Sequence, residues 1–232
     1  REAKAGKVRA RLDRRQFLWI DARGAGAWYP AAGNIRAGAG EKGTLAIWQW
    51  PQYTHDNTDL YWRLEVNSSN YIRQCSGRTL GVCSNGTIWY ASTEWKTATV
   101  AWEHLVYTWD FTVADQGHLR VYWNGVDAGY HIDNANAPVG TPTKLELGPV
   151  TGTISHGPHM MYSMAVWDDV MTAAQAATLW REGLRYQITG AEGNGNLTLY
   201  AGFNDRLNAD YAAGDGTFHV DGAADRYCLV DD

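Results

Sequence analysis

The clearest pattern of hydrophobic and polar positions lies in residues 102–125. Apolar and polar side chains alternate in residues 104–109 and again in 118–123, as they do in strands that bury one face. The loop between the two runs carries Asp110, Asp115 and Gly117, and Asn124-Gly125 follows the second run. Asn-Gly tolerates positive φ better than most dipeptides. The sequence therefore predicts a hairpin, a second tight turn and a third strand, and we expect each strand to have one buried face.

Similar but shorter runs occur along most of the chain. Val8, Ala10 and Leu12 alternate with charged residues, which predicts a strand near the amino end. Residues 22–43 are rich in Ala and Gly and are expected to form a long loop. A strand is predicted at residues 43–48, and Pro51 is expected to end it. Leu45, Ile47 and Gln49 should share one face. Further strands are predicted at residues 17–20, 61–66, 71–74, 86–91, 98–102, 144–147 and 160–167.

One helix is expected, after the last of these strands. Thr172 can cap its first turn, and Gln175 stands three residues later, as in a reciprocal capping box. Residues 173–180 are adequate helix formers, and Gly183 is placed for a left-handed turn at the carboxyl end.

The composition supports an all-β protein. The 232 residues include 25 Gly but only 6 Pro, and 12 Trp and 13 Tyr but only 4 Phe, which suits strands and turns better than a helical bundle. We predict one two-sheet antiparallel β-sandwich with one short helix, of the kind in which jelly rolls are also built. Most Trp rings are expected in the core, and a few are expected at the surface as platforms for sugar rings.

The cysteines leave two alternatives open. Cys75 and Cys83 are separated by seven residues, which a hairpin with a loop could bring together as a disulfide, or both could be free thiols in the core. An oxidised pair would indicate an extracellular location. Cys228 has no obvious partner in either case.

Several of these segments resemble the laminin G-like, concanavalin A-like jelly-roll domains. The resemblance rests on Trp-x-His at 102–104, Tyr-Thr-Trp-Asp at 107–110, Gly-x-Leu-Arg-Val-Tyr-x-Asn-Gly at 117–125, and the strand and helix of 160–183. It extends from about Gly43 to Gly183. It implies a β-sandwich that binds or connects other molecules, and only some members of the superfamily are catalytic.

The segment after the helix is unusual for such a domain. Residues 197–232 resemble the strand that opens the sandwich in bacterial and phage relatives, but here they follow the core. We therefore divide the chain into a jelly roll at 1–188 with its core at 43–183, a linker at 189–196 and a tail at 197–232. The tail could complete its own sandwich, insert into a second copy, or begin a truncated repeat.

Charge favours insertion into a second copy. Residues 1–23 contain eight basic and three acidic residues, a net +5, whereas residues 197–232 contain seven acidic and two basic residues, a net −5. Opposite charges on neighbouring strands attract, whether within one chain or between two. The expected assembly residues are Leu197, Leu199 and Phe203 on the tail and Val8, Ala10 and Leu12 on the amino-terminal strand.

No catalytic constellation is evident. Glucanases of this superfamily carry closely spaced acids on one strand. Here Glu65 and Glu146 are isolated on predicted strands, and both are expected to face solvent. The resemblance implies a calcium site, for which Asp168, Asp169, Asn204 and Asp205 are the candidates.

We therefore expect a non-catalytic structural or adhesive module outside the cell or on a cell or virion surface. Its expected partners are copies of itself joined head to tail. The alternative is a calcium-dependent lectin that binds glycans, and a glycosidase or lyase is a third hypothesis. The net charge of −5 argues against nucleic acid as a partner, and no run of about 18 apolar residues predicts membrane insertion.

Overall fold

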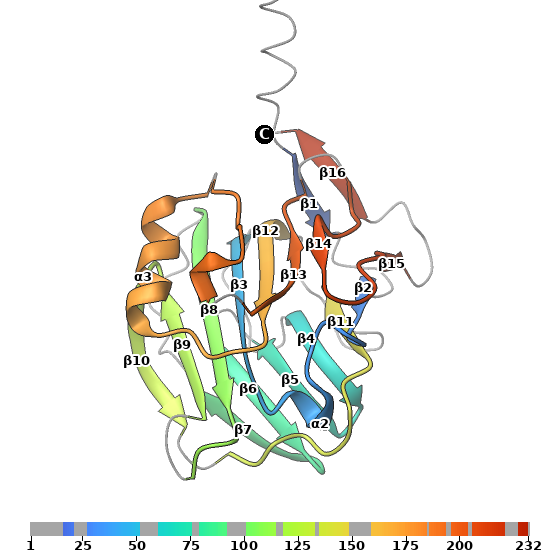
Figure 1. Ribbon diagram of the computed structural model, residues 1–232, viewed down its shortest axis with the longest axis vertical. Helices are drawn as coiled ribbons and strands as arrows, with labels where there is room; N and C mark the ends of the chain where they lie inside the picture. Colours follow the sequence, from blue (N-terminus) through green and yellow to red (C-terminus); the bar gives the residue numbers. More distant parts are fainter. Residues whose placement is uncertain are drawn as a thin grey trace, which may run out of the picture.

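The chain forms two antiparallel β-sheets packed face to face, as predicted (Figure 1). In this computed structural model, every ladder between described strands is antiparallel. The structure describes residues 16–20, 27–51, 60–75, 79–91, 101–114, 118–132, 135–148, 159–184, 186–193, 196–203, 206–220 and 227–231.

The first sheet, called sheet A here, has nine strands. In spatial order they are β10 (Val126–Ile132), β9 (Leu119–Trp123), β8 (Glu103–Asp110), β3 (Lys42–Pro51), β12 (His159–Trp167), β1 (Gln16–Ile20) and β16 (Tyr227–Asp231), with β13 (Leu197–Ala201) paired to β12 and β14 (Tyr211–Ala212) paired to β13.

The second sheet, called sheet B, has seven strands. In spatial order they are β15 (His219–Val220), β2 (Ala27–Pro30), β11 (Lys144–Leu147), β4 (Leu60–Asn67), β5 (Asn70–Cys75), β6 (Thr79–Ser84) and β7 (Thr87–Ala91).

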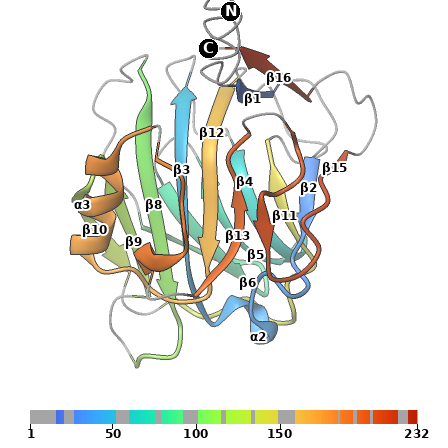
Figure 2. The same ribbon diagram turned by 45° about the horizontal axis from the view of Figure 1, so that its top comes forward.

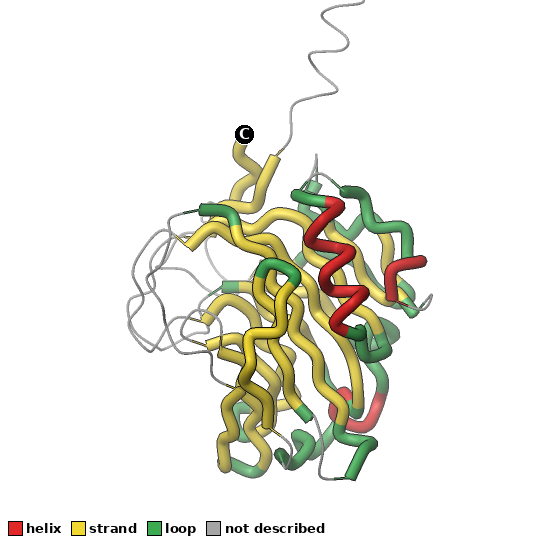
Figure 3. The backbone as a smooth tube through the Cα atoms, turned by 90° about the vertical axis from the view of Figure 1, so that its left-hand side faces the viewer, coloured by secondary structure: helices red, strands yellow, loops and turns green. Residues whose placement is uncertain are grey.

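The predicted helix is α3 (Ala173–Glu182), which lies beside β8, β9 and β10 in Figure 1 and on the outside of the strands in Figure 3. The capping box between Thr172 and Gln175 is confirmed. Gly183 has φ 81° but ψ 176°, so it ends the helix in an extended, glycine-specific conformation instead of the left-handed turn that we expected. In the part of the chain that the structure describes, no helix has the length and apolar character needed to cross a membrane.

The predicted hairpins are confirmed. Strands β8, β9 and β10 follow one another, and Asn124 and Gly125 both have positive φ in the turn between β9 and β10. The expectation of a long loop at residues 22–43 was wrong in part, because β2 and the short helix α2 (Ala37–Gly40) lie within this segment. Strand β6 was not predicted, and the described end of the strand expected at residues 98–102 is not a strand.

Strand β8 is buried on both faces, so the expectation of one buried face was wrong. Leu105, Tyr107 and Trp109 point into the main core between the sheets, which sheet B covers. Val106 belongs instead to a second apolar cluster on the outer face of sheet A, beneath α3 and the chain after it, from which Tyr186 and Ile188 pack against the cluster. Its other members are Ala46, Tyr122, Ala165, Trp167, Met171, Ala176, Leu179, Leu197 and Tyr200.

Two strands from opposite ends of the chain share one edge of β12. Residues 159–161 of β12 pair with β1, and residues 164–167 pair with β13. Between the two sections Ser163 has a positive φ of 49°, and the register of β12 against β3 shifts there. This irregularity is a β-bulge that keeps Met161 and Met164 on the same, inner face. The chain after α3 therefore contributes strands to the same sandwich as the residues before it.

Of the two alternatives for Cys75 and Cys83, the disulfide is wrong, and Cys83 is a buried free thiol. The register of the hairpin explains the error, because Cys75 lies opposite Thr79 whereas Cys83 lies opposite Tyr71. Four residues of strand separate the two positions, about 13 Å at 3.3 Å per residue, which is too far for a disulfide. The Cys83 thiol instead donates to the carbonyl oxygen of Ser69 at 3.3 Å.

Candidate functional site

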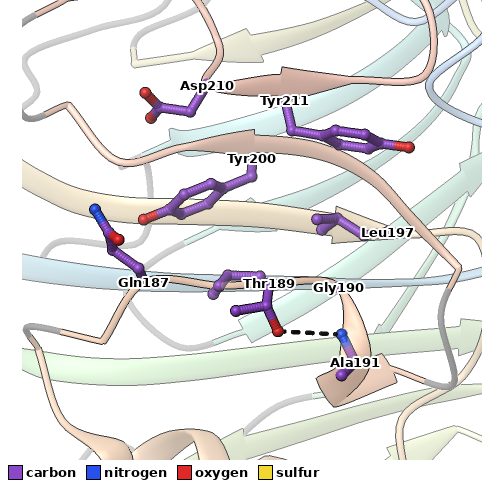
Figure 4. Close-up of a pocket in the computed structure, with 9 residues that line it drawn as sticks. Gln187, Thr189, Gly190, Ala191, Leu197, Tyr200, Asp210 and Tyr211 are labelled. Atoms are coloured by element: carbon purple, nitrogen blue, oxygen red, sulfur yellow. Dashed lines mark hydrogen bonds between the residues drawn. The ribbon is translucent and has the colours of Figure 1, made fainter.

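A pocket of about 630 Å³ lies on the outer side of sheet A, where the chain between α3 and β13 passes β13 and β14 (Figure 4). The volume is within the range of small-molecule sites. Its lining combines two aromatic rings, a carboxylate, an amide and a hydroxyl with aliphatic and backbone groups. The lining residues are Gln187, Ile188, Thr189, Gly190, Ala191, Leu197, Tyr200, Asp210 and Tyr211.

Glu192 holds the loop that forms one wall of the pocket. Its carboxylate accepts hydrogen bonds from the Tyr186 hydroxyl at 2.6 Å, from the amide and hydroxyl of Thr189 at 3.0 Å each, and from the Gly190 amide at 2.8 Å. Burial raises the pKa of Glu192, but these hydrogen bonds outweigh burial and leave the pKa below its usual value. The wall is therefore fixed by an ionised carboxylate, and the Ala191 amide adds a long contact of 3.5 Å to the Thr189 hydroxyl (Figure 4).

The two tyrosines of the pocket have different surroundings. Tyr200, on β13, is only 7% exposed, and burial raises the pKa of its hydroxyl while a hydrogen bond to Ser163 opposes the rise. Tyr211, on β14, is 48% exposed and is one of the few large apolar side chains at the surface of the described residues. Tyr200 thus forms a rigid part of the wall, and Tyr211 offers an accessible ring beside it.

Asp210 is the one acidic side chain among the lining residues. Its carboxylate accepts from the Gly202 amide at 2.7 Å and from Nη2 of Arg206 at 2.7 Å. These bonds fix the carboxylate at the edge of the pocket and balance its charge.

The structure places the expected tail anchors within their own chain. Leu199 and Phe203 lie in the main core, but Leu197 joins the outer cluster, because the register against β12 shifts between Val166 and Trp167. Val8, Ala10 and Leu12 lie outside the described residues. The segment expected to be a linker includes the 3-10 helix η1 (Ala191–Gly193), and Gly193 packs against the Trp167 ring.

Asp168 and Asp169, two of the four calcium candidates, each form an ion pair with a basic side chain. Arg36 Nε lies 2.5 Å from Oδ2 of Asp168, and Lys42 Nζ lies 3.0 Å from Oδ1 of Asp169. Burial raises the pKa of Asp169, but hydrogen bonds, first of all that from Lys42, leave it below the usual value. Asn204 and Asp205 lie outside the described residues. Because Arg36 and Lys42 already neutralise the two carboxylates, this arrangement does not fit a calcium ion.

The expectation that Glu65 and Glu146 are isolated and face solvent is wrong. Both belong to an ion-pair cluster on the outer face of sheet B, where β4 and β11 are neighbours. Arg63 pairs with both glutamates, and Lys144 Nζ lies 2.5 Å from Glu146. The Glu146 side chain is only 6% exposed and that of Arg63 only 12% exposed. Within the described ranges, no group of three or more His, Cys, Asp or Glu side chains is arranged to hold a metal ion.

Sequence reasoning did not identify the pocket. Gln187, Tyr200 and Tyr211 belong to segments that meet only because β13 and β14 extend sheet A beside the loop after α3. The available signal was general, since exposed aromatic rings were expected to form sugar platforms but could not be assigned to positions.

Comparisons with known proteins agree on the sandwich. Domain 4 of an extracellular GH43 arabinanase from Geobacillus stearothermophilus, solved with arabinotriose, is 18% identical over 66% of this chain and 71% of that chain, with a TM-score of 0.51. A heptameric SAP-like pentraxin from Limulus polyphemus is 15% identical over 94% and 89% of the two chains, with a TM-score of 0.52.

A structure of botulinum neurotoxin type C, whose cell entry depends on interaction with two ganglioside molecules, is 10% identical over 64% of this chain and has a TM-score of 0.51. The match spans 37% of that chain, little more than a third of its length. No protein-family model matches this chain, and no curated protein matches it in sequence. At these identities the similarity establishes the two-sheet β-sandwich fold.

Proposed function

We propose that this protein is a non-catalytic, extracellular glycan-binding module of the laminin G-like type, and that the pocket beside Tyr211 holds a neutral sugar. The observation that carries the proposal is the half-exposed Tyr211 ring next to fixed polar groups. Sugars present both apolar C–H faces and hydroxyl groups, so they suit a site that combines a ring with a few oriented hydrogen-bonding groups.

The charge of the lining favours a neutral ligand. Asp210 is the one lining residue with a formal charge, and Arg206 already pairs with it. An anionic sugar would meet an acidic residue without a cation in the lining. Gln187 and Thr189 are neutral side chains that can bond sugar hydroxyls.

The same lining argues against a glycosidase, which is the alternative function. Hydrolysis by the common mechanism needs two carboxyl groups on either side of the scissile bond. Asp210 is the one carboxylate among the residues that line this pocket, and it already accepts hydrogen bonds from the Gly202 amide and the Arg206 guanidinium. Release of reducing sugar from any common polysaccharide would favour the hydrolase hypothesis instead.

The comparisons provide independent support, since one sandwich of this kind was solved with arabinotriose and another belongs to a toxin that interacts with gangliosides. A glycan array of neutral oligosaccharides that includes arabinotriose, followed by calorimetric titration of the best ligand, tests the proposal. Tyr211→Ala should weaken binding roughly tenfold, because it removes the stacking surface. Tyr211→Phe should keep most of the affinity.

Tyr90→Ala is the matched control, because Tyr90 is 41% exposed but lies on β7 of the other sheet. We expect it to leave affinity unchanged, and we expect EDTA to have no effect on a pocket that lacks a free carboxylate pair. No binding on the array, or equal losses for Tyr211→Ala and Tyr90→Ala, would overturn the assignment of this pocket.

A further inference from the structure

The two ends of the described chain pair as an antiparallel ribbon twice, once in each sheet. In sheet A, Gln16 pairs with Asp231 and Ile20 with Tyr227, whereas in sheet B, Ala27 pairs with Val220 and Trp28 with His219. The two residue numbers add up to 247 in all four pairs. The register is therefore the same on both sides of the intervening segments, which have equal lengths, residues 21–26 and 221–226.

Strand β16 is the outermost strand of the ribbon in sheet A. Among the described residues its only ladder is with β1, and β1 pairs with β12 through just three residue pairs. Figures 1 and 2 show β1 and β16 side by side at the upper end of the sandwich, beyond the region that α3 covers. Strand β16 is thus an edge strand, and its five-pair ladder with β1 holds it to the sheet.

The rest of the tail is firmly attached to its own chain. The Asn34 side chain accepts from the Gly214 amide at 2.9 Å and donates to the Asp215 carbonyl at 3.0 Å. At Gly214 the backbones approach so closely that a Cβ atom would lie 2.1 Å from the Ala32 carbonyl oxygen. His219 stacks on Trp28 with ring centres 4.1 Å apart. An exchange limited to β16 therefore costs far less than exchange of the whole tail.

The charges of residues 1–23 and 197–232 are complementary within one copy and equally between two copies. The amino-terminal 23 residues carry a net +5, and residues 197–232 carry a net −5. Two copies of the chain therefore attract each other when the acidic end of one copy approaches the basic end of the other. A second copy also offers the same β1 edge, in the same register, that β16 uses within its own chain.

We propose that β16 of one copy pairs with β1 of a second copy, with residues 221–226 as the connection between the two bodies. The main-chain bonds and the register are those of the single chain, so the exchange forms no new type of pairing within the ladder. The partner is a second copy of this chain, and the interaction is independent of glycan binding.

Disulfide trapping between variants that each carry one introduced cysteine tests the exchange. Gln16→Cys and Asp231→Cys are made in separate chains, both with Cys228→Ser, carried on tags of different size, mixed and oxidised. These two positions are direct partners in the ladder. A disulfide between the two tagged chains requires pairing between copies, whereas a chain that carries both substitutions reports pairing within one copy.

The control mixture combines Gln16→Cys with Thr217→Cys, an exposed position before β15 that does not pair with β1. We expect at least tenfold more linked heterodimer from the register pair than from the control, rising with protein concentration and falling with added salt. The proposal is overturned if linked heterodimer stays at the control level, whether the doubly substituted chain closes on itself or forms no disulfide at all.

Discussion

The outer faces of the two sheets differ in what covers them. On sheet A, α3 and the loop between α3 and β13 cover apolar side chains, so β8 and β12 are buried on both sides. On sheet B, the outer face carries the ion-pair cluster of Arg63, Glu65, Lys144 and Glu146. It also carries Ile88 and Tyr90, which are among the most exposed apolar residues of the described chain.

The difference shows what the tail contributes. Without β13 and the loop before it, much of the outer cluster of sheet A would face water, which disfavours a separately folded jelly roll that ends before the tail. Sheet B stabilises its outer face in another way, by pairing charges from neighbouring strands. Mutations on the two faces should therefore change the free energy of unfolding by different amounts, and these changes should depend differently on pH and on salt.

The largest effect is expected for Trp167→Ala. The Trp167 ring is fully buried in the outer cluster and packs on Gly193, so its loss leaves a large cavity. We expect the free energy of unfolding to fall by about 3–5 kcal/mol, measured by urea denaturation. Tyr90→Ala on the outer face of sheet B is the control, with a change of about 0.5 kcal/mol or less. Similar losses for both variants would contradict the comparison.

The next effect concerns pH and His104, which lies beneath α3 on the outer face of sheet A. Burial lowers its pKa from 6.5 to about 3, and its ring packs against Trp48 at 4.9 Å. Between these two pKa values the unfolded chain binds a proton that the folded chain does not, so stability is complete above about pH 6.5 and falls as the pH drops towards 3. The slope should approach about 1.4 kcal/mol per pH unit.

Thermal unfolding from pH 7 to pH 4 measures this slope. His104→Gln should lower the slope by about 1.4 kcal/mol per pH unit, the contribution of one proton, because glutamine does not titrate in this range. An unchanged slope in the variant would show that folding does not lower the pKa of His104.

A smaller effect is expected for Glu146→Gln on sheet B. The substitution leaves Arg63 and Lys144 with Glu65 as their shared acidic partner, in a setting where the Arg63 side chain is only 12% exposed. We expect a loss of about 1–3 kcal/mol in denaturant titrations. Asp127→Asn, which removes an exposed partner of Arg120 at 3.9 Å, should cost about 0–1 kcal/mol. Equal costs would mean that the cluster behaves like ordinary surface ion pairs.

The sequence predicted best where local chemistry decides the structure. Asn124-Gly125 formed the expected turn, and Thr172 with Gln175 formed the expected cap, because each signal acts within a few residues. The two-sheet sandwich was also predictable, since alternation along many short runs leaves few other ways to bury the apolar face.

The sequence could not predict what depends on register and on distant segments. His104, Val106 and Thr108 alternate with large apolar residues and therefore resemble a solvent face, yet α3 and residues after it cover this side of sheet A. The pairing of Glu146 with Arg63 and the separation of Cys75 from Cys83 both follow from which residues stand opposite each other in the ladders. The pocket was missed for the same reason.

The bulge at Ser163 has a consequence for how the protein folds. It divides the edge of β12 between β1, which the ribosome makes early, and β13, which it makes late, and β1 then needs β16 on its other side. Nearly the whole sandwich must be synthesised before β1 gains both of its neighbours. Such a sheet has a high contact order, so its closure should be slow, and one edge of β1 stays unpaired until β16 has emerged.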